Sequence, residues 1–167
     1  MRAQFLALSF VAVTTGAFAQ QAAPQMRTFL NNKEIMALVD KAKADRKNDA
    51  PLVGEPILLL APYRAMLEYR PATAPAALHE KDAELMVVLD GTGNIVTGGK
   101  IVDEKRVNSA NLSGPSIADG NTQAVVKGDM LIVPANTPHQ VIPTGGAPIV
   151  LMTLHVPSAP ANWPPAN

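Results

Sequence analysis

The chain has 167 residues, contains no cysteine, and balances 14 Lys and Arg residues against 14 Asp and Glu residues. This length suits a single domain with a real hydrophobic core. The balanced charge argues against nucleic acid or an anionic membrane as a partner, and it favours small molecules or further copies of the chain. The lack of cysteine excludes disulfides, thiolate metal ligands and a cysteine nucleophile.

The beginning of the sequence has the pattern of a secretory signal peptide. A short basic start at Met1–Arg2 precedes an apolar stretch from Phe5 to Phe18, which ends in the small-x-small triplet Ala17–Ala19. The pattern predicts removal of residues 1–19 and a periplasmic or secreted protein with no membrane contact after cleavage. The alternative is a retained anchor, which the short apolar stretch disfavours because a bilayer span needs about 20 residues.

A polar leader and one amphipathic helix are predicted for residues 20–55. Asn31 can cap the helix while Glu34, three positions later, bonds back to the amide of Asn31, as in a capping box. Apolar side chains then recur at helical spacing through about Arg46. We expect this helix to serve as a lid or a brace rather than as a catalytic element.

Residues 56–157 are predicted to form an all-β barrel or sandwich. Short runs of Val, Ile and Leu alternate with Gly, Pro and Asn turns, and no further helical pattern occurs. The expected strands are Ile57–Leu60, Arg64–Tyr69, Glu84–Leu89, Ile95–Thr97, Lys100–Val102, Thr122–Val126, Met130–Val133, Gln140–Ile142 and Ile149–Val156.

Two stretches within these strands, Leu85–Leu89 and Ile149–Leu154, are apolar on both faces. Such a strand lies between two packed layers or at an interface between subunits. We therefore expect a homodimer. The last segment, residues 158–167, is rich in proline and carries the only tryptophan, Trp163, so an extended tail is predicted.

His79, Glu84 and His139 lie in two segments that together have the pattern of a divided metal site. Two imidazoles and a carboxylate can hold a divalent transition metal and leave other positions open to substrate. His79 and Glu84 are five positions apart, so an unbroken strand would place them on opposite faces, and we expect a turn or bulge between them. A lone carboxylate on an apolar face is costly unless a cation meets it.

These two segments resemble the two motifs of the cupin superfamily. The first family motif has two histidines one residue apart, a glutamate and a glycine, and His79, Glu84 and Gly91 match the last three of these. The second motif has a glycine, a proline, a further turn residue and a histidine. Its matching positions here are Gly128, Pro134, Asn136, where glycine is usual, and His139. The resemblance covers about Tyr63 to Pro157 and implies a double-stranded β-helix, or jelly-roll, barrel with a metal at its centre.

The sequence departs from the family pattern at Ala77, which stands where the first histidine would be. The usual three histidines and one glutamate are thereby reduced to two and one. This smaller set still matches the facial arrangement of oxygen-using iron(II) sites, and manganese, zinc and nickel stay open as alternatives. Glu80 and Asp82 are not counted as ligands, because their charged neighbours indicate a solvated turn.

Two further features have alternative interpretations. His155, near the end of the last long strand, is a candidate fourth ligand, proton shuttle or substrate contact, or else a strand-end histidine half in water or at a dimer seam. Arg64, Glu68 and Arg70 form one row of a strand, and either this row or the opposite one should face the barrel interior. The alternative is an outward row of paired charges, which we favour slightly for the arginines.

The leading functional hypothesis is an exported, metal-binding small-molecule metalloenzyme of oxygenase, isomerase or lyase type. Its substrate would be a small organic acid or a hydroxylated compound whose oxygen atoms bind the metal as a Lewis acid. The alternative is a non-catalytic ligand-binding cupin, in which Ala77 marks a weakened or absent metal site.

Overall fold

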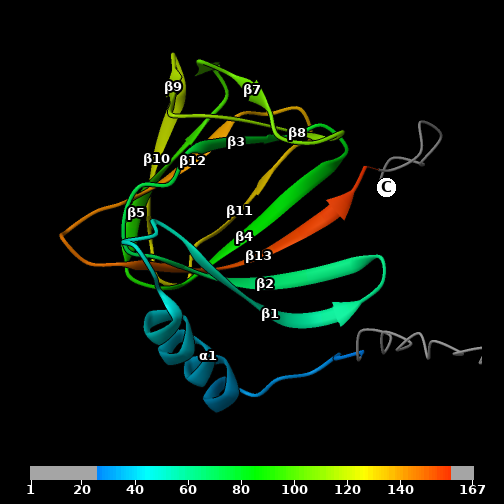
Figure 1. Ribbon diagram of the computed structural model, residues 1–167, viewed down its shortest axis with the longest axis vertical. Coiled ribbons are helices and arrows are strands. Elements are labelled where there is room, and N and C mark those ends of the chain that lie inside the picture. The colour runs from blue at the N-terminus through cyan, green and yellow to red at the C-terminus, as the bar shows by residue number, and fades with distance from the viewer. Residues whose placement is uncertain (1–25, 159–167) are drawn as a thin grey trace, which may run out of the picture.

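The computed structural model describes residues 26–158, in which one helix is followed by thirteen strands (Figure 1). The predicted signal peptide, residues 1–19, and the predicted tail from residue 159 onward, with Trp163, lie outside the described residues. Within the described range no helix is long and apolar enough to cross a membrane. The elements are α1 (Asn32–Asp45), β1 (Val53–Leu60), β2 (Tyr63–Arg70), β3 (Ala76–His79), β4 (Asp82–Asp90), β5 (Thr92–Thr97), β6 (Lys100–Val102), β7 (Lys105–Arg106), β8 (Asn111–Gly114), β9 (Ser116–Ala118), β10 (Asn121–Val126), β11 (Met130–Val133), β12 (His139–Pro143) and β13 (Ile149–Pro157).

Helix α1 begins at the predicted capping box. The side-chain oxygen of Asn31 accepts a hydrogen bond from the Glu34 amide at 3.0 Å, and the Glu34 carboxylate accepts one from the Asn31 amide at 2.8 Å. Val39 and Ala42 are buried against the sheet, in one cluster with Leu67. Because β2 alternates, this outer row is opposite the row that faces the barrel interior. The helix is therefore a brace on the outside of the barrel and not a lid over its interior.

Two antiparallel sheets pack face to face around the main core. Their strand orders are β1-β2-β13-β4-β11 and β10-β5-β12-β3-β8-β7, and a two-stranded β6-β9 sheet is added to them. The core takes side chains from both large sheets, among them Met86, Ile95, Val141 and Leu151. Each such side chain stabilises the fold by roughly 1.5–3 kcal/mol through removal of apolar area from water. This is the predicted jelly-roll architecture, although β1 begins at Val53, slightly before the predicted start of the barrel.

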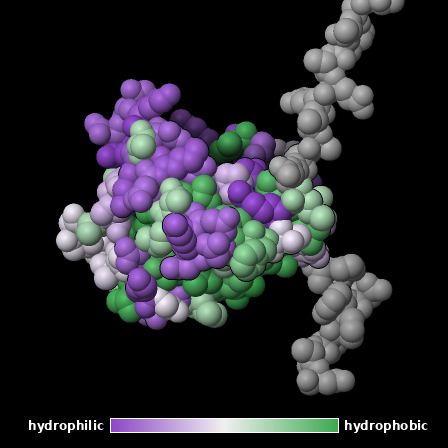
Figure 2. All heavy atoms as spheres, turned by 90° about the horizontal axis from the view of Figure 1, so that it is seen from below, coloured by the Kyte–Doolittle hydropathy of each residue, from purple (hydrophilic) through white to green (hydrophobic). Residues whose placement is uncertain are grey.

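The two strands that are apolar on both faces, β4 and β13, lie side by side in the five-stranded sheet. Their inner rows enter the core, and Leu89 and Met152 on the outer rows pack in the cluster beneath α1. On the neighbouring edge strand β11, however, Met130 and Ile132 are 69% and 58% exposed. Figure 2, which views the molecule from below, shows broad apolar surface beside polar side chains. The helix thus covers only part of this outer face.

Several strands were not among those expected, and β3 and β8 matter most because they carry site residues. β3 is rich in alanine, which has low strand propensity, so its sequence does not indicate a strand. It is held in the sheet by pairing with β8 on one side and β12 on the other. Ala76 and Leu78 pack outward against Ile101, which leaves Ala77 and His79 to face the barrel interior.

Candidate metal centre

Glu84 lies at the meeting point of all three histidines of the chain. The Nε2 atom of His139 is 2.9 Å from Glu84 Oε2, that of His79 is 3.3 Å from the same oxygen, and that of His155 is 3.8 Å from Oε1. Candidate ligand atoms of His79, Glu84 and His155 all lie within 4.8 Å of one another. The structure therefore brings together the three predicted ligands and also His155, whose role the sequence left open.

The spacing of His79 and Glu84 is resolved by a turn, as expected. β3 ends at His79 in one sheet and β4 begins at Asp82 in the other, so the intervening residues carry the chain across the end of the barrel. Glu80 in this turn forms a two-pronged ion pair with Arg106, with both N···O distances at 2.8 Å. Glu80 thus lies in the predicted solvated turn and pairs away from Glu84.

The segment that leads to His139 has a left-handed backbone at two positions. Gly128, in the turn before β11, has φ +93°, and Asn136, in the loop between β11 and His139, has φ +60°. Asparagine tolerates this region better than other non-glycine residues, which explains its presence where glycine is usual. The backbone amide of Asn136 donates a hydrogen bond to the backbone carbonyl of His79 at 2.8 Å. One hydrogen bond thereby joins the two halves of the site.

The outer nitrogens of two imidazoles are held by oxygen acceptors. Nδ1 of His79 donates to the side-chain oxygen of Asn111 at 2.9 Å, and Nδ1 of His139 donates to the Thr137 carbonyl at 3.2 Å. Because these oxygens accept, Nδ1 carries the proton in each ring, and Nε2 can present its lone pair to the site. This is the arrangement by which proteins orient histidine ligands toward a metal.

The carboxylate of Glu84 is 3% exposed, and its Oε2 has no hydrogen bond within residues 26–158. The nearest imidazole nitrogen, Nε2 of His139, is 2.9 Å from this oxygen. Burial acts to raise the pKa of Glu84, but the imidazoles of His139 and His79 outweigh it and hold that pKa well below its usual range. The site is therefore built around an anion that needs a cation at its centre.

The environment of His79 has the complementary effect. Burial acts to lower its pKa, while contacts with Glu84 and Asn111 act in the opposite direction and raise the pKa above that of a free imidazole. Protons and metal ions are alternative cations for such a cluster of lone pairs. The donor set of imidazole and carboxylate, with no thiolate in the chain, suits a divalent transition metal.

A cavity of about 370 Å³ adjoins the four side chains. Glu68 and Arg70 of β2 line it, so their row of the strand faces the interior. This corrects the interpretation of Arg70 as part of an outward row, whereas Arg64, at the other end of the strand, is exposed as that interpretation expected. The physical reason is that the opposite row of β2, which includes Leu67, packs against α1, so the row with Arg70 has to face the interior. The remaining walls are mostly small and apolar and include Ala77, Pro51, Leu52, Ala74 and Pro75.

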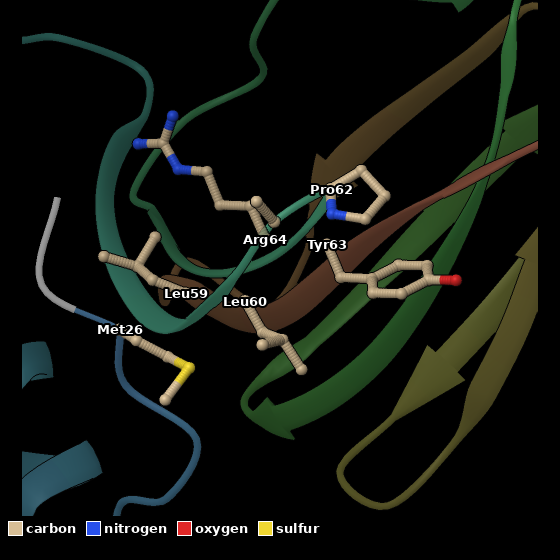
Figure 3. Close-up of a pocket in the computed structure, with 7 residues that line it drawn as sticks. Met26, Leu59, Leu60, Pro62, Tyr63 and Arg64 are labelled. Carbon is tan, nitrogen blue, oxygen red and sulfur yellow. The ribbon is translucent and has the colours of Figure 1, made fainter. Parts of the chain in front are cut away.

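A second hollow, of about 450 Å³, lies outside the barrel at the turn between β1 and β2. It is lined mainly by apolar residues, among them Met26, Leu60 and Tyr63 (Figure 3). The guanidinium of Arg64 is turned away from Met26 and Leu60 in this view. No histidine or carboxylate lines it, so the smaller cavity at Glu84 is the candidate site for chemistry.

Sequence reasoning missed Asn111 as a site residue, and it left open whether Glu68 and Arg70 face the site. Asn111 lies directly opposite His79 in the β3–β8 ladder, although 32 positions separate the two residues in the chain. No local pattern announces that register, because β8 is short and polar. For Arg70, the alternation of the strand limits the choice to two faces, and only the position of the helix decides between them.

The sequence matches no protein-family model, and no curated protein matches it. An uncharacterised conserved protein with a double-stranded β-helix domain from Klebsiella pneumoniae has a TM-score of 0.51 at 14% identity, covering 71% of this chain and 86% of that one. The iron(II) form of HppE has a TM-score of 0.50 at 16% identity, covering 66% and 53%. The cupin domain of Schizosaccharomyces pombe Cnp3 has a TM-score of 0.49 at 14% identity, covering 65% and 63%.

The chain therefore has the cupin fold, a double-stranded β-helix, as its sequence motifs indicated. The matched part spans about half the length of HppE and less than two thirds of the Cnp3 domain. At these identities the comparisons establish the fold alone, and the chemistry of the site has to be argued from its own residues.

Proposed function

We propose that this chain is a metal-binding cupin in which His79, Glu84 and His139 hold a divalent transition metal and His155 is a fourth donor. The observation that carries this proposal is the buried Oε2 of Glu84, which has three imidazoles around its carboxylate and no hydrogen bond within residues 26–158. Two of the imidazoles have Nδ1 committed to oxygen acceptors. A metal satisfies all of these lone pairs at once, and iron, manganese, zinc and nickel all accept this donor set.

We further propose that the cavity beside this centre takes a small-molecule substrate for an oxygenase, isomerase or lyase reaction. When bound, the metal would act as a Lewis acid toward oxygen atoms of the substrate. His155, the proposed fourth donor, also borders the cavity, and its side chain is 37% exposed, so this side of the centre is the one nearest to solvent.

Metal analysis of protein purified without chelators tests the metal centre. We expect about one transition metal per chain, with most of it lost in Glu84→Gln and in His139→Ala. Glu80→Gln is the matched control, because it removes a carboxylate four positions away that pairs with Arg106 instead. Metal content that is equally low in wild type and in Glu84→Gln would defeat the proposal.

The same protein distinguishes an enzyme from a carrier. An enzyme of this kind should accumulate product from a small acid or hydroxylated compound only when metal is present. A ligand that stabilises the metal-free protein as much as the metal-loaded one, without turnover, would instead support the non-catalytic alternative that Ala77 suggests.

We also propose export to the periplasm or the medium, on the basis of the signal-peptide pattern in residues 1–19. Intact mass measurement of protein recovered from the periplasmic fraction should give a chain that starts after Ala19. Recovery of the uncleaved chain with membranes would contradict this proposal and support the retained anchor.

A second copy of the chain is the partner we propose for the uncovered outer face of β4 and β11. Ile132 and Met130 continue the apolar outer row of β4, since they pair with Leu85 and Val87 across the ladder. The chain carries no net charge, so two copies do not repel each other strongly. Light scattering should report a dimer that Ile132→Lys converts to monomer, whereas Val126→Lys, at an exposed position of the other sheet, leaves the dimer intact. A monomeric wild type would refute this arrangement.

A further inference from the structure

A buried ion pair lies in the wall of the cavity beside the candidate metal centre. Nε of Arg70 donates a hydrogen bond to Oε2 of Glu68 at 2.8 Å, and Nη2 forms an ion pair with the same oxygen at 2.7 Å. The two side chains are only 11% and 15% exposed. Burial of two charges gains little stability compared with apolar residues of the same size, so the pair needs another explanation.

The guanidinium keeps donors free for a ligand. Within residues 26–158 its one side-chain hydrogen bond, from Nε, and its ion pair, from Nη2, both go to one oxygen of Glu68, and Nη1 has neither. Thr153 donates to the other oxygen of Glu68 at 3.4 Å, which helps to fix the carboxylate and hence the guanidinium. Arg70 is therefore held rigidly at the cavity wall with part of its donor fork unused.

The charge of the cavity favours an anion. With a divalent metal bound, the cavity would contain the positive charges of the metal and Arg70 against the negative charges of Glu68 and Glu84, which leaves a net positive charge. A guanidinium binds carboxylates by paired, charge-assisted hydrogen bonds that strengthen out of water. The apolar side chains of Leu52 and Pro75 suit a short hydrocarbon segment of the ligand.

We propose that Arg70 binds a carboxylate of the substrate, so that the substrate class is a small organic acid with a second oxygen-bearing group that reaches the metal. Glu68 is a positioning residue for the guanidinium. This inference rests on the proposed metal centre. It adds a binding residue for the end of the substrate that does not contact the metal.

The test is calorimetric binding of short diacids to zinc-loaded protein, with malonate, succinate and glutarate each compared with its monoamide. We expect at least a tenfold preference for one diacid over its monoamide in wild type. The double variant Glu68→Gln/Arg70→Gln should lose that preference without leaving either charge buried alone. Arg64→Gln, on the same strand but outside the cavity, is the control and should keep it.

Zinc content is measured for every protein in the series. A preference that survives in the double variant, or no diacid preference in wild type that contains zinc, overturns the inference and leaves the metal centre standing. Failure of wild type to bind zinc overturns the proposed function itself. Retention of zinc by the double variant, together with loss of the preference, supports both.

Discussion

Asn111 offers a sharp test of the metal centre, because it contacts one ligand without belonging to the ligand set. Its side-chain oxygen accepts the Nδ1 proton of His79 at 2.9 Å and so directs Nε2 toward Glu84. Asn111→Ala removes that acceptor and frees the ring to rotate or to change tautomer. Loss of such an outer partner typically lowers metal affinity about 10–100-fold.

This loss of affinity converts into a measurable change in thermal stability. At a free metal concentration of 100 times the dissociation constant, metal stabilises wild type by about 2.7 kcal/mol. The same concentration is only about 1–10 times the dissociation constant of the variant, which leaves roughly 0.4–1.4 kcal/mol of stabilisation. Each kcal/mol corresponds to about 3–5 °C in a domain of this size, so the metal-induced shift in Tm should fall from about 10 °C to about 2–6 °C.

The assay is thermal unfolding of wild type and variant with chelator and with metal at one fixed free concentration. The chelated samples measure the direct cost of the lost hydrogen bond, about 1 kcal/mol, which cancels when the metal-induced shifts are compared. Asn108→Ala is the matched control, since Asn108 bonds the Ala110 amide in the preceding turn and touches no histidine.

A conservative replacement decides between orientation and general damage. Asn111→Asp keeps an acceptor opposite Nδ1 and adds a negative charge, so the metal-induced shift should equal or exceed that of wild type. If Asn111→Ala gives the full wild-type shift, or if Asn111→Asp loses the shift as completely as Asn111→Ala does, the orienting role of this residue is refuted.

Three further predictions concern pH, the core and one turn. Contacts with Glu84 outweigh burial and raise the pKa of His79, so protons compete with metal as pH falls through that raised value. The affinity for metal, titrated between pH 5 and 8, should therefore decrease at the acid end and level off at the alkaline end. Leu151→Ala, at a fully buried position, should lower the free energy of unfolding in urea by about 2–5 kcal/mol, and the effect should far exceed that of Leu60→Ala at a half-exposed position. Gly91→Ala should destabilise the protein more than Gly128→Ala in the same urea assay. Both glycines have positive φ, but only a Cβ at Gly91 would clash, at 2.3 Å from the Pro148 carbonyl oxygen. Equal losses of stability would show that the backbone conformation alone matters.

The sequence predicted the helix and the strands of the all-β core because both depend on local signals, whereas the jelly-roll arrangement was implied by the resemblance of the two motifs. The capping residues Asn31 and Glu34 are three positions apart. The apolar residues that follow Glu84 are consecutive in the sequence, so a short window is enough to identify the strand. The turn between His79 and Glu84 was also predictable. Side chains five positions apart on an unbroken strand point to opposite faces, so the strand must be interrupted to bring both inward. These inferences require no knowledge of which strands pair.

The rest of the site depends on pairings between distant segments. Asn111 acquires its role only when β8 pairs with β3, and Arg70 faces the cavity only because α1 packs on the opposite side of β2. Neither β3 nor β8 has the β-branched composition that announces a strand. The outer layer of the candidate metal centre is therefore a property of the assembled sheets rather than of any local motif.

Ala77 and His155 have linked consequences for the centre. Ala77 pairs with His139 across the β3–β12 ladder, so its small side chain leaves out an imidazole on that side of the carboxylate. His155 pairs with Glu84 across the β4–β13 ladder and supplies an imidazole from the five-stranded sheet, whereas Ala77 lies in the six-stranded sheet. The number of imidazoles beside Glu84 is thus kept at three, while the space next to Ala77 becomes part of the cavity wall. A ligand in the cavity would therefore lie against Ala77, close to the residues that would hold the metal.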